Sequence, residues 1–381
     1  MHYNAAMAAP QKIVHMIGAL GEFDASHNLR ELARQQAAAG GDVSVIAFFA
    51  NGAARRGIEA AGVKCEIIRK RWGYDPFAAR QLAQSLKDLR PGIVHLWGRR
   101  ATDAALIVRR ALPEAKLIAT LVKVPQLRNP WWPNKSLDAL DAIIVEREQV
   151  RAEFVDAGQG EAKVSVIPPG SSLSHDKTHS RRELLIHLAL PTEARILTIA
   201  GPLERWQLVD EAIWAFELIR ILHDHTHLVI VGDGPERARL ERFTRQVTEP
   251  GVVRFVPRVE VLHDVLAHSE IFWQPGESET IPLAMLSAMS QGVPVVASDV
   301  PAHRAVITTE ENGYLVPTAK RAIWARHTDQ LLRSADLRTK FAQAARKTVL
   351  ENYSLLSMTQ AYGQLYQDLA AQKPRLCSLP Y

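Results

Sequence analysis

The sequence predicts an α/β protein with two doubly wound parallel-sheet domains that face each other across a cleft. Its 381 residues exceed the roughly 250–300 residues at which a single hydrophobic core stops growing. Short apolar runs alternate with amphipathic segments, which is the pattern of βαβ units. This alternation stops in the Pro-, Gly-, Ser- and His-rich stretch 164–180 and then restarts, so that stretch is the predicted linker.

In the first half, each predicted strand is a short apolar run and each predicted helix has apolar residues at helical spacing. Gly40 and Gly41 end the first helix, and the Pro91-Gly92 pair separates the second helix from the next strand. The strands are expected at residues 12–17, 43–49, 93–96, 116–121 and 142–145, and the helices at 27–39, 76–89 and 102–110.

The second half repeats the alternation and ends in two long helices, 321–351 and 355–371. Before them, strands are expected at 195–200, 227–231, 252–256, 271–274 and 294–297, and helices at 209–222, 236–246, 259–268 and 281–291. The two halves therefore read as two Rossmann-like domains, one over 1–170 and the other over 171–350.

The composition excludes several classes of protein. Cys65 and Cys377 are too few for a disulfide framework or a four-cysteine zinc site. No apolar run approaches the roughly 18 residues of a membrane span, and the first residues lack the apolar block of a secretory signal. We therefore expect a cytoplasmic protein.

The net charge of +5 belongs to the first half of the chain. Residues 1–170 hold 23 Lys and Arg against 17 Asp and Glu, whereas the remainder holds 23 against 24. The basic residues gather at Arg69-Lys70-Arg71, Arg99-Arg100 and Arg109-Arg110. Such a half favours acidic substrates or an anionic lipid surface, although a solvated basic face explains it equally well.

The segment 271–300 carries the most chemistry. A strand ends at Gln274 and is followed by a loop with Glu277 and Glu279. In a doubly wound sheet ligands bind beyond the carboxyl ends of the strands, so this loop should line a ligand site. The next helix begins there, and its N-terminus favours a phosphate or a sugar oxygen.

Several short motifs accompany this segment in a fixed order. They are VIPPG at 166–170, LVIVGDGP at 228–235, PGESETIPLAMLSAMSQGVPVVASD at 275–299, NGYLVP at 312–317 and ENYS at 351–354. Together they resemble glycosyltransferases with the GT-B fold, in particular glycosyltransferase family 4, over nearly the whole chain. The last two helices are similar to those of the family, in which the final helix, here within 351–381, crosses back to the first domain.

The resemblance implies transfer of a sugar from a nucleotide-sugar donor to an acceptor held by the first domain. It implies retention of the anomeric configuration, no metal and no cofactor apart from the donor substrate. A glycan or a lipid-linked molecule is the expected acceptor, with contact between the basic domain and the inner membrane surface. Nucleic acid is not an expected partner, because the basic residues lack interleaved aromatic residues or a known binding motif.

Donor-site roles follow from the matched positions. Glu279 matches the first Glu of the E-x7-E pair, which holds donor-sugar hydroxyls, and Ser287 occupies the slot of the second, which contacts the ribose. Thr280 begins the segment that replaces the family's Gly-Phe-Gly loop, and Gly234 lies in its glycine-rich turn. The first loop carries Gly18 and Gly21, whose backbone N–H groups would point at the donor phosphates.

The cations of the family's diphosphate clamp are replaced here. Pro202 and Gln207 stand where the family has Arg and Lys, and neither can form a charge-assisted contact to phosphate. Arg205, two positions before the Lys slot, is long enough to substitute for it. On the acceptor side the resemblance retains His95 and places Trp97 where the same strand of the family has a second His. The His of the turn after the next strand is replaced by Val122, and Lys123 is a neighbouring cation.

These replacements leave a second hypothesis open, namely a catalytically degenerate relative that binds a nucleotide, a glycan or a partner without transferring sugar. Smaller alternatives also remain. His95 is as well explained as a satisfied core histidine, and Trp131-Trp132 as a packed loop rather than a sugar platform. The alternating His223, His225 and His227 suggest a polar strand start more than a metal site, since a fourth ligand is missing.

Overall fold

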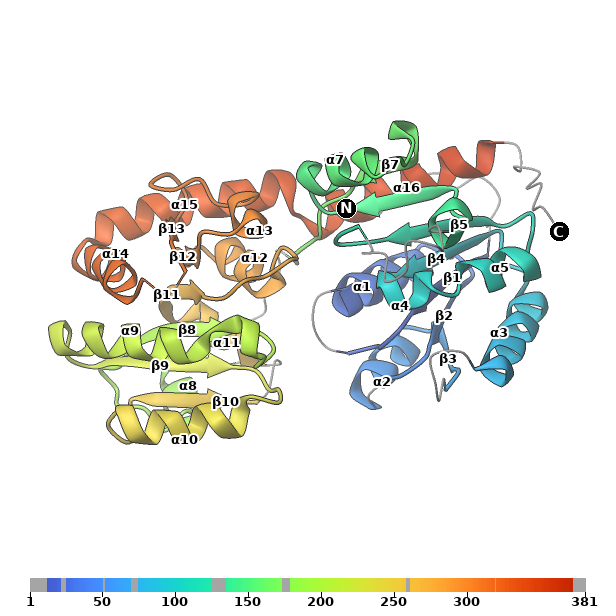
Figure 1. Ribbon diagram of the computed structural model, residues 1–381. Coiled ribbons are helices and arrows are strands. Elements are labelled where there is room, and N and C mark those ends of the chain that lie inside the picture. Colours follow the sequence, from blue (N-terminus) through green and yellow to red (C-terminus); the bar gives the residue numbers. More distant parts are fainter. Residues whose placement is uncertain are drawn as a thin grey trace. The chain divides into compact units, whose positions relative to one another are not determined.

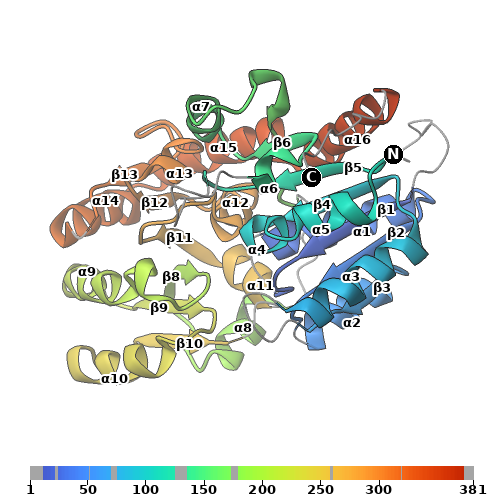
Figure 2. The same cartoon turned by 45° about the vertical axis from the view of Figure 1, so that its right-hand side comes forward.

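A computed structural model describes residues 12–21, 25–50, 52–69, 75–124, 135–172, 179–257, 261–318 and 320–372. The predicted Trp131-Trp132 loop and two members of the Arg69–Arg71 cluster lie outside these residues. Internal contacts divide the chain into two compact units. Unit 1 comprises residues 1–168 and 356–381, and unit 2 comprises residues 169–355. Each unit is described by itself (Figures 1 and 2).

Unit 1 is built on a seven-stranded parallel sheet in the order β3-β2-β1-β4-β5-β6-β7. Four of its central strands are buried along their whole length, which is why they read as continuous apolar runs in the sequence. The strands are β1 (Ile13–Ile17), β2 (Val43–Ala47), β3 (Lys64–Ile67), β4 (Ile93–Trp97), β5 (Lys116–Thr120), β6 (Ala142–Val145) and β7 (Val164–Val166).

The helices of unit 1 cover both faces of this sheet (Figure 1). They are α1 (Ala25–Ala38), α2 (Gly52–Ala60), α3 (Pro76–Leu89), α4 (Gly98–Thr102), α5 (Ala105–Ala111), α6 (Lys135–Asp138), α7 (Glu148–Asp156) and α16 (Leu355–Ala371). Asp75 caps α3 by accepting hydrogen bonds from two backbone N–H groups, and Pro76 provides the first helical residue. The single helix expected at 102–110 is wrong, because a turn at Asp103-Ala104 separates α4 from α5.

Unit 2 contains a six-stranded parallel sheet in the order β10-β9-β8-β11-β12-β13. Its strands are β8 (Arg195–Ala200), β9 (Thr226–Val231), β10 (Val253–Val256), β11 (Ser269–Gln274), β12 (Val295–Ser298) and β13 (Tyr314–Val316). Two hydrophobic clusters pack against it, one around Phe272 and Met289 and the other around Phe216 and Trp273. The prediction of two parallel-sheet domains is therefore confirmed.

The helices of unit 2 are α8 (Arg181–His187), α9 (Val209–Leu222), α10 (Arg237–Val247), α11 (Leu262–Ala267), α12 (Leu283–Ser290), α13 (Pro301–Arg304), α14 (Arg321–Arg333) and α15 (Ala335–Asn352). The predicted long helix 321–351 is wrong, because Ser334 interrupts it. Ser334 adopts an extended conformation, and its side chain accepts a hydrogen bond from the N–H of Leu337, so it begins a new helix.

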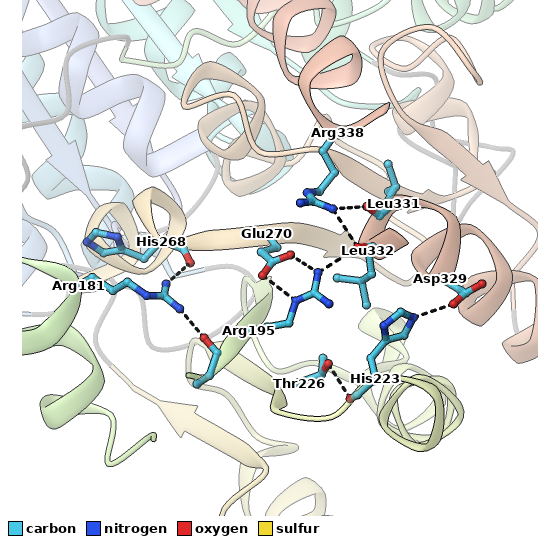
Figure 3. A network of polar contacts seen from close by, with 11 residues as sticks. Arg181, Arg195, His223, Thr226, His268, Glu270, Asp329, Leu331, Leu332 and Arg338 are labelled. Carbon is cyan, nitrogen blue, oxygen red and sulfur yellow. Dashed lines mark hydrogen bonds and ion pairs between the residues drawn. The ribbon is translucent and has the colours of Figure 1, made fainter. Parts of the chain in front are cut away.

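A polar network closes the amino-terminal edge of the unit 2 sheet (Figure 3). Arg195, the first residue of β8, forms two hydrogen bonds of 2.9 and 2.6 Å with the carboxylate of Glu270 and a third with the carbonyl of Leu332. Burial raises the pKa of Glu270, but the contact with Arg195 outweighs it and leaves this pKa below its usual value. The network therefore ties β8, β11 and α14 together at the edge opposite the strand carboxyl ends.

A buried polar cluster joins α16 to the sheet of unit 1. Within it, the Nδ1 of His95 lies 2.6 Å from the hydroxyl of Tyr366, and its Nε2 lies 2.8 Å from the hydroxyl of Thr120. The hydroxyl of Tyr362 also contacts Thr120, at 3.2 Å. All four side chains are buried, so these hydrogen bonds replace those that water would supply.

His15 extends this cluster and should make unit 1 sensitive to acid. Its ring accepts a hydrogen bond from Trp97, contacts Gln36 at 2.8 Å and is fully buried. Burial lowers its pKa from 6.5 to about 4, against a smaller opposing effect of Gln36. The unfolded state therefore binds the proton more readily, and stability present above pH 6.5 is lost as the pH falls towards 4.

We expect this loss to reach about 3 kcal/mol for His15, since each pKa unit corresponds to about 1.36 kcal/mol. Hydrogen exchange of the β1 and β4 amides at pH 7 and pH 4.5 measures it. His15→Gln keeps an acceptor for Trp97 but cannot titrate, so its stability should change less over this range. An equal change in the variant and the wild type would contradict the assignment.

Among the described residues, no helix combines the length and the apolar character that crossing a bilayer requires.

Candidate functional site

The candidate site lies at the carboxyl edge of the unit 2 sheet. Strand β8 is flanked by β9 on one side and β11 on the other, so the direction of winding reverses between β8 and β11. In open α/β sheets, ligands bind beyond the carboxyl ends of the strands at this switch point. The loops that follow β8 and β11, residues 201–208 and 275–282, therefore form the candidate site together with the turn 232–236 after β9.

Two of these loops are joined along their backbones. The N–H of Leu203 donates to the carbonyl of Asp233, and the N–H of Glu236 donates to the carbonyl of Leu203. A Cβ on Gly234 would overlap the backbone of Leu203, and a Cβ on Gly232 would overlap that of Gly201. The glycine turn is thus required for loop packing, and the N–H of Gly234 is already bound to the side chain of Asp233.

Arg205 and Gln207 differ completely in their surroundings. Gln207 is 3% exposed, and its carbonyl oxygen accepts a 3.4 Å hydrogen bond from Gln274. It occupies the space that Gly201 leaves by lacking a side chain. Arg205 is exposed in a short 3₁₀ turn, and in the described part of the chain it forms no ion pair or hydrogen bond through its side chain. Of the two, only Arg205 can meet a ligand.

The loop after β11 rests directly on this turn. The N–H of Glu277 donates to the carbonyl of Trp206 at 2.9 Å. The hydroxyl of Ser278 bonds to the carbonyl of Thr280 at 2.6 Å and accepts from its N–H, which holds the loop tip in a tight turn. This turn leaves Glu279 exposed while the residues on either side of it are more buried.

Gly276 makes this contact possible, and its replacement tests the contact. Its φ is +90°, and an added Cβ would lie 2.5 Å from the carbonyl oxygen of Trp206 and 2.6 Å from Cα of Gln207. We expect Gly276→Ala to lower the stability of unit 2 by about 1–3 kcal/mol, because the αL conformation is strained and the backbone must move.

Urea unfolding followed at unit 2 measures this effect. Gly251→Ala is the matched control, since Gly251 also has a positive φ of 92° but its Cβ would meet only the guanidinium of Arg254, at an ordinary contact distance of 3.5 Å. If both variants lost the same stability, backbone strain alone would explain the result and the loop contact would contribute nothing.

Ser287 lies on α12, half-buried, with its hydroxyl 3.5 Å from that of Ser171. It faces the first residues of unit 2, which include Ser171. Glu279 lies in the loop before α12, so both residues of the predicted pair belong to the same side of the sheet edge.

The candidates of unit 1 divide into exposed and buried residues. Lys123 is exposed just after β5. His95 is 0% exposed, and its two ring nitrogens are both hydrogen-bonded, so the structure favours the core interpretation of this residue. In the first loop, the N–H of Leu20 donates to Phe49 and the N–H of Gly21 donates to the Ser26 hydroxyl. Of the two glycine amides expected to face phosphate, that of Gly21 is therefore already used.

Sequence reasoning missed the neighbour of Gly18. A Cβ on Gly18 would lie 2.5 Å from Cβ of Arg100, so the stem of Arg100 lies across this glycine. The sequence signal for this contact is the pair Arg99-Arg100 immediately after a predicted strand.

The alternating histidines have ordinary partners. His223 bonds to Asp329 at 2.7 Å, and Nδ1 of His227 bonds to the carbonyl of His225 (Figure 3 shows the first of these). No group of three or more His, Cys, Asp or Glu side chains within the described ranges is arranged to hold a metal ion.

Two known families match the chain, and their matches meet between residues 175 and 180, close to the division of the fold between 168 and 169. The sequence profile of the family described as "Glycosyl transferases group 1" matches residues 180–348, and that of "Glycosyltransferase Family 4" matches residues 26–175. Together they match most of the chain. The chain belongs to the GT-B glycosyltransferases.

Solved glycosyltransferases share the whole fold. Anabaena HepE in complex with UDP superposes with a TM-score of 0.77 at 15% identity, covering 94% of this chain and 100% of HepE. A glycosyltransferase from Rickettsia africae gives 0.81 at 15% identity, covering 95% of this chain and 100% of its own. At such identities the likeness concerns the fold alone.

Curated relatives align over shorter regions. The N-acetyl-alpha-D-glucosaminyl L-malate synthase of Bacillus anthracis is 26% identical over 175 residues, which is 46% of each protein. The D-inositol 3-phosphate glycosyltransferase of Corynebacterium urealyticum is 27% identical over 252 residues, covering 61% of this chain and 58% of that enzyme. The chain thus spans about half the length of the relatives it matches.

Within this GT-B glycosyltransferase, the altered positions have clear structural settings. Gln207 is buried against Gln274. Pro202 lies between Gly201, whose N–H donates to the carbonyl of Val231 at the end of β9, and Leu203, which bonds to the turn after β9. Val122 is half-buried beside the exposed Lys123. The loops 201–208, 232–236 and 275–282 of unit 2 therefore contain one exposed cation, Arg205.

Proposed function

We propose that this protein transfers a sugar from a nucleotide-sugar donor bound by unit 2 to an acceptor bound by unit 1. In the proposed reaction the bond between the sugar C1 and the diphosphate breaks, and a bond from C1 to an acceptor oxygen forms. The acceptor proton is released, and the nucleoside diphosphate leaves with the additional negative charge. The anomeric configuration is retained, and the donor is a substrate, so no further cofactor is invoked.

The switch point between β8 and β11 supports this proposal most directly. The loops 201–208 and 275–282 are bonded there, and they expose a cation on one side, Arg205, and a carboxylate on the other, Glu279. A guanidinium suits a diphosphate, and a carboxylate suits sugar hydroxyl groups. We assign Arg205 to the phosphates, Glu279 and Thr280 to the sugar, Ser287 to the ribose, and Gly234 to the shape of the loop.

On unit 1 we assign Lys123 to the acceptor side and give His95 a positioning role in the core. UDP is the first nucleotide to test, since the structural neighbour HepE was solved in complex with UDP and with UDP-glucose. Calorimetry with uridine, guanosine and adenosine diphosphates and their sugars provides the test. Binding of one nucleotide with a dissociation constant below millimolar would support the proposal and name the donor.

A second candidate function is binding without transfer. It is favoured by Pro202, Gln207, Val122 and Ser287, which replace family residues with others that cannot do the same chemistry. If no nucleotide bound with a dissociation constant below millimolar, binding without transfer would be favoured over the enzyme.

Glu279→Ala distinguishes contacts to the sugar from contacts to the nucleotide. We expect the affinity for the nucleotide-sugar to fall about 10- to 100-fold, because hydrogen bonds to a charged group contribute roughly 1.5–3 kcal/mol. The affinity for the free nucleoside diphosphate should stay unchanged. Glu277→Ala, which removes an exposed carboxylate two residues earlier, is the control. Equal losses for both ligands would contradict the sugar assignment.

A further inference from the structure

We propose that the carboxyl edge of the unit 1 sheet carries an anion-binding site formed by Arg99 and Arg100, which takes a phosphate or carboxylate group of the acceptor. The inference rests on the proposed function, because it names the class of acceptor that the transfer would use. It follows from the position, the packing and the charge of these two residues.

The position is the topological switch point of the unit 1 sheet. Strands β1, β2 and β3 follow one another in one direction, and β4 to β7 continue in the other, so the reversal lies between β1 and β4. Gly18 follows β1, and Gly98-Arg99-Arg100 follows β4, with Ile17 and Trp97 paired at the ends of the two strands. Ligands of open α/β sheets bind at this place.

The packing of Arg100 gives it a defined location. Its Cβ, Cδ and Cγ lie 2.5, 3.1 and 3.3 Å from the point where a Cβ on Gly18 would be. Its aliphatic stem therefore lies across the first loop, and only a glycine at position 18 leaves room for it. Both arginines are exposed, and neither guanidinium has a hydrogen-bond or ion-pair partner among the described residues. Their donors are available to a ligand.

The charge of the edge is consistent with this site. Within three residues after the strand ends of unit 1, the described residues include five cations and two carboxylates. These are Arg69, Arg99, Arg100, Lys123 and Arg147, with Glu146 and Glu148. The same positions in the described part of unit 2 hold Asp233, Glu277 and Asp299 and no Lys or Arg. By sequence alone, Lys70 and Arg258 also fall within three residues of a strand end, one in each unit, so the excess of positive charge belongs to the unit proposed to hold the acceptor.

The chemistry of two adjacent guanidinium groups selects an anion. Each presents a planar set of donors that matches a carboxylate or phosphate with two parallel hydrogen bonds. A neutral sugar hydroxyl gains little from either group. The anionic group is either part of a small acceptor or the headgroup of a lipid, and both sources share this chemistry.

The test compares the full-length protein with Arg99→Ala/Arg100→Ala and with a matched control, Arg110→Ala. Arg110 is an exposed arginine of unit 1 whose side chain has no partner in the described ranges, but it lies in the last turn of α5, ahead of the amino end of β5. Glycerol 3-phosphate and glycerol are titrated by NMR, and binding to vesicles of phosphatidylglycerol with phosphatidylcholine is compared with phosphatidylcholine alone. UDP affinity is measured for all three proteins, and melting temperatures verify that they fold.

We expect the double variant to bind glycerol 3-phosphate at least about tenfold more weakly than the wild type and Arg110→Ala, with UDP affinity unchanged. If instead only vesicle binding falls, the anion is a lipid headgroup and the site stands. Equal losses in Arg110→Ala, or unchanged binding in the double variant, would overturn the proposal. So would a loss of UDP affinity in the double variant, since the arginines would then serve the donor. Failure of the wild type to bind UDP would sink the proposed function separately.

Discussion

Replacing Arg205 with alanine is expected to lower kcat/KM for sugar transfer by roughly 10²- to 10³-fold. The diphosphate gains negative charge as the bond to the sugar breaks, and a prepositioned cation stabilises that charge in the transition state. Arg205 is the one Lys or Arg in loops 201–208, 232–236 and 275–282, all of which the structure describes. Since Pro202 and Gln207 carry no charge, nothing else in these loops can replace it.

The matched control is Arg242→Ala. Arg242 is an exposed arginine on α10 that forms no ion pair with any described residue, so its loss changes the net charge of unit 2 equally. The kcat/KM of the Arg242→Ala variant should stay within about twofold of the wild-type value. Arg205→Lys should recover part of the activity, because a point charge remains without the paired donors. Near-normal turnover of Arg205→Ala would show that Arg205 does not contact the diphosphate.

The central strands were predictable because burial on both faces requires apolar residues along their whole length. Residues 195–200 and 142–145 match β8 and β6 for this reason. Strand β3 was missed, since an edge strand such as Lys64–Ile67 is only partly buried and alternates charge with apolar residues. Helix α2 was missed because its GAARRGIEA sequence has few apolar residues to mark a face.

The candidate site was predictable in its location but not in its contacts. A strand followed by a polar loop and a helix marks the carboxyl edge of a sheet, and that pattern located the loop around Glu279. The burial of Gln207 against Gln274 and the packing of Arg100 on Gly18 depend on residues distant in sequence. The sequence suggested that Arg205 could reach a ligand. In the structure, Gln207 is buried while Arg205 is exposed, so of these two residues only Arg205 is accessible to a ligand.

His95 is a second residue whose role the sequence alone could not decide. Its place near the end of a strand permitted either a catalytic or a core role, and the sequence contains no signal that decides between them. The deciding contact is with Tyr366, 271 positions later in the chain. Helix α16 belongs to unit 1 although the residues before it belong to unit 2, so that contact arises only when the chain returns.

Replacing Tyr366 with alanine is expected to destabilise unit 1 by about 3–5 kcal/mol. The change removes a buried aromatic ring that packs against His95 and Tyr362, and it leaves a cavity between α16 and the sheet. It also leaves Nδ1 of His95 without its 2.6 Å partner. Tyr366→Phe separates the two effects, because it keeps the ring and removes only the hydroxyl, and should cost about 1–3 kcal/mol.

Hydrogen exchange of individual strands is the appropriate measurement, since a single free energy of unfolding is not well defined for a chain of two compact units. Protection should fall in β4 and β5 of unit 1 and stay unchanged in β8 and β9 of unit 2. Leu356→Ala, on the exposed face of α16, should change protection by no more than about 0.5 kcal/mol. A uniform loss over both sheets would mean that α16 stabilises the two units together, and the buried cluster would then not be a local anchor of unit 1.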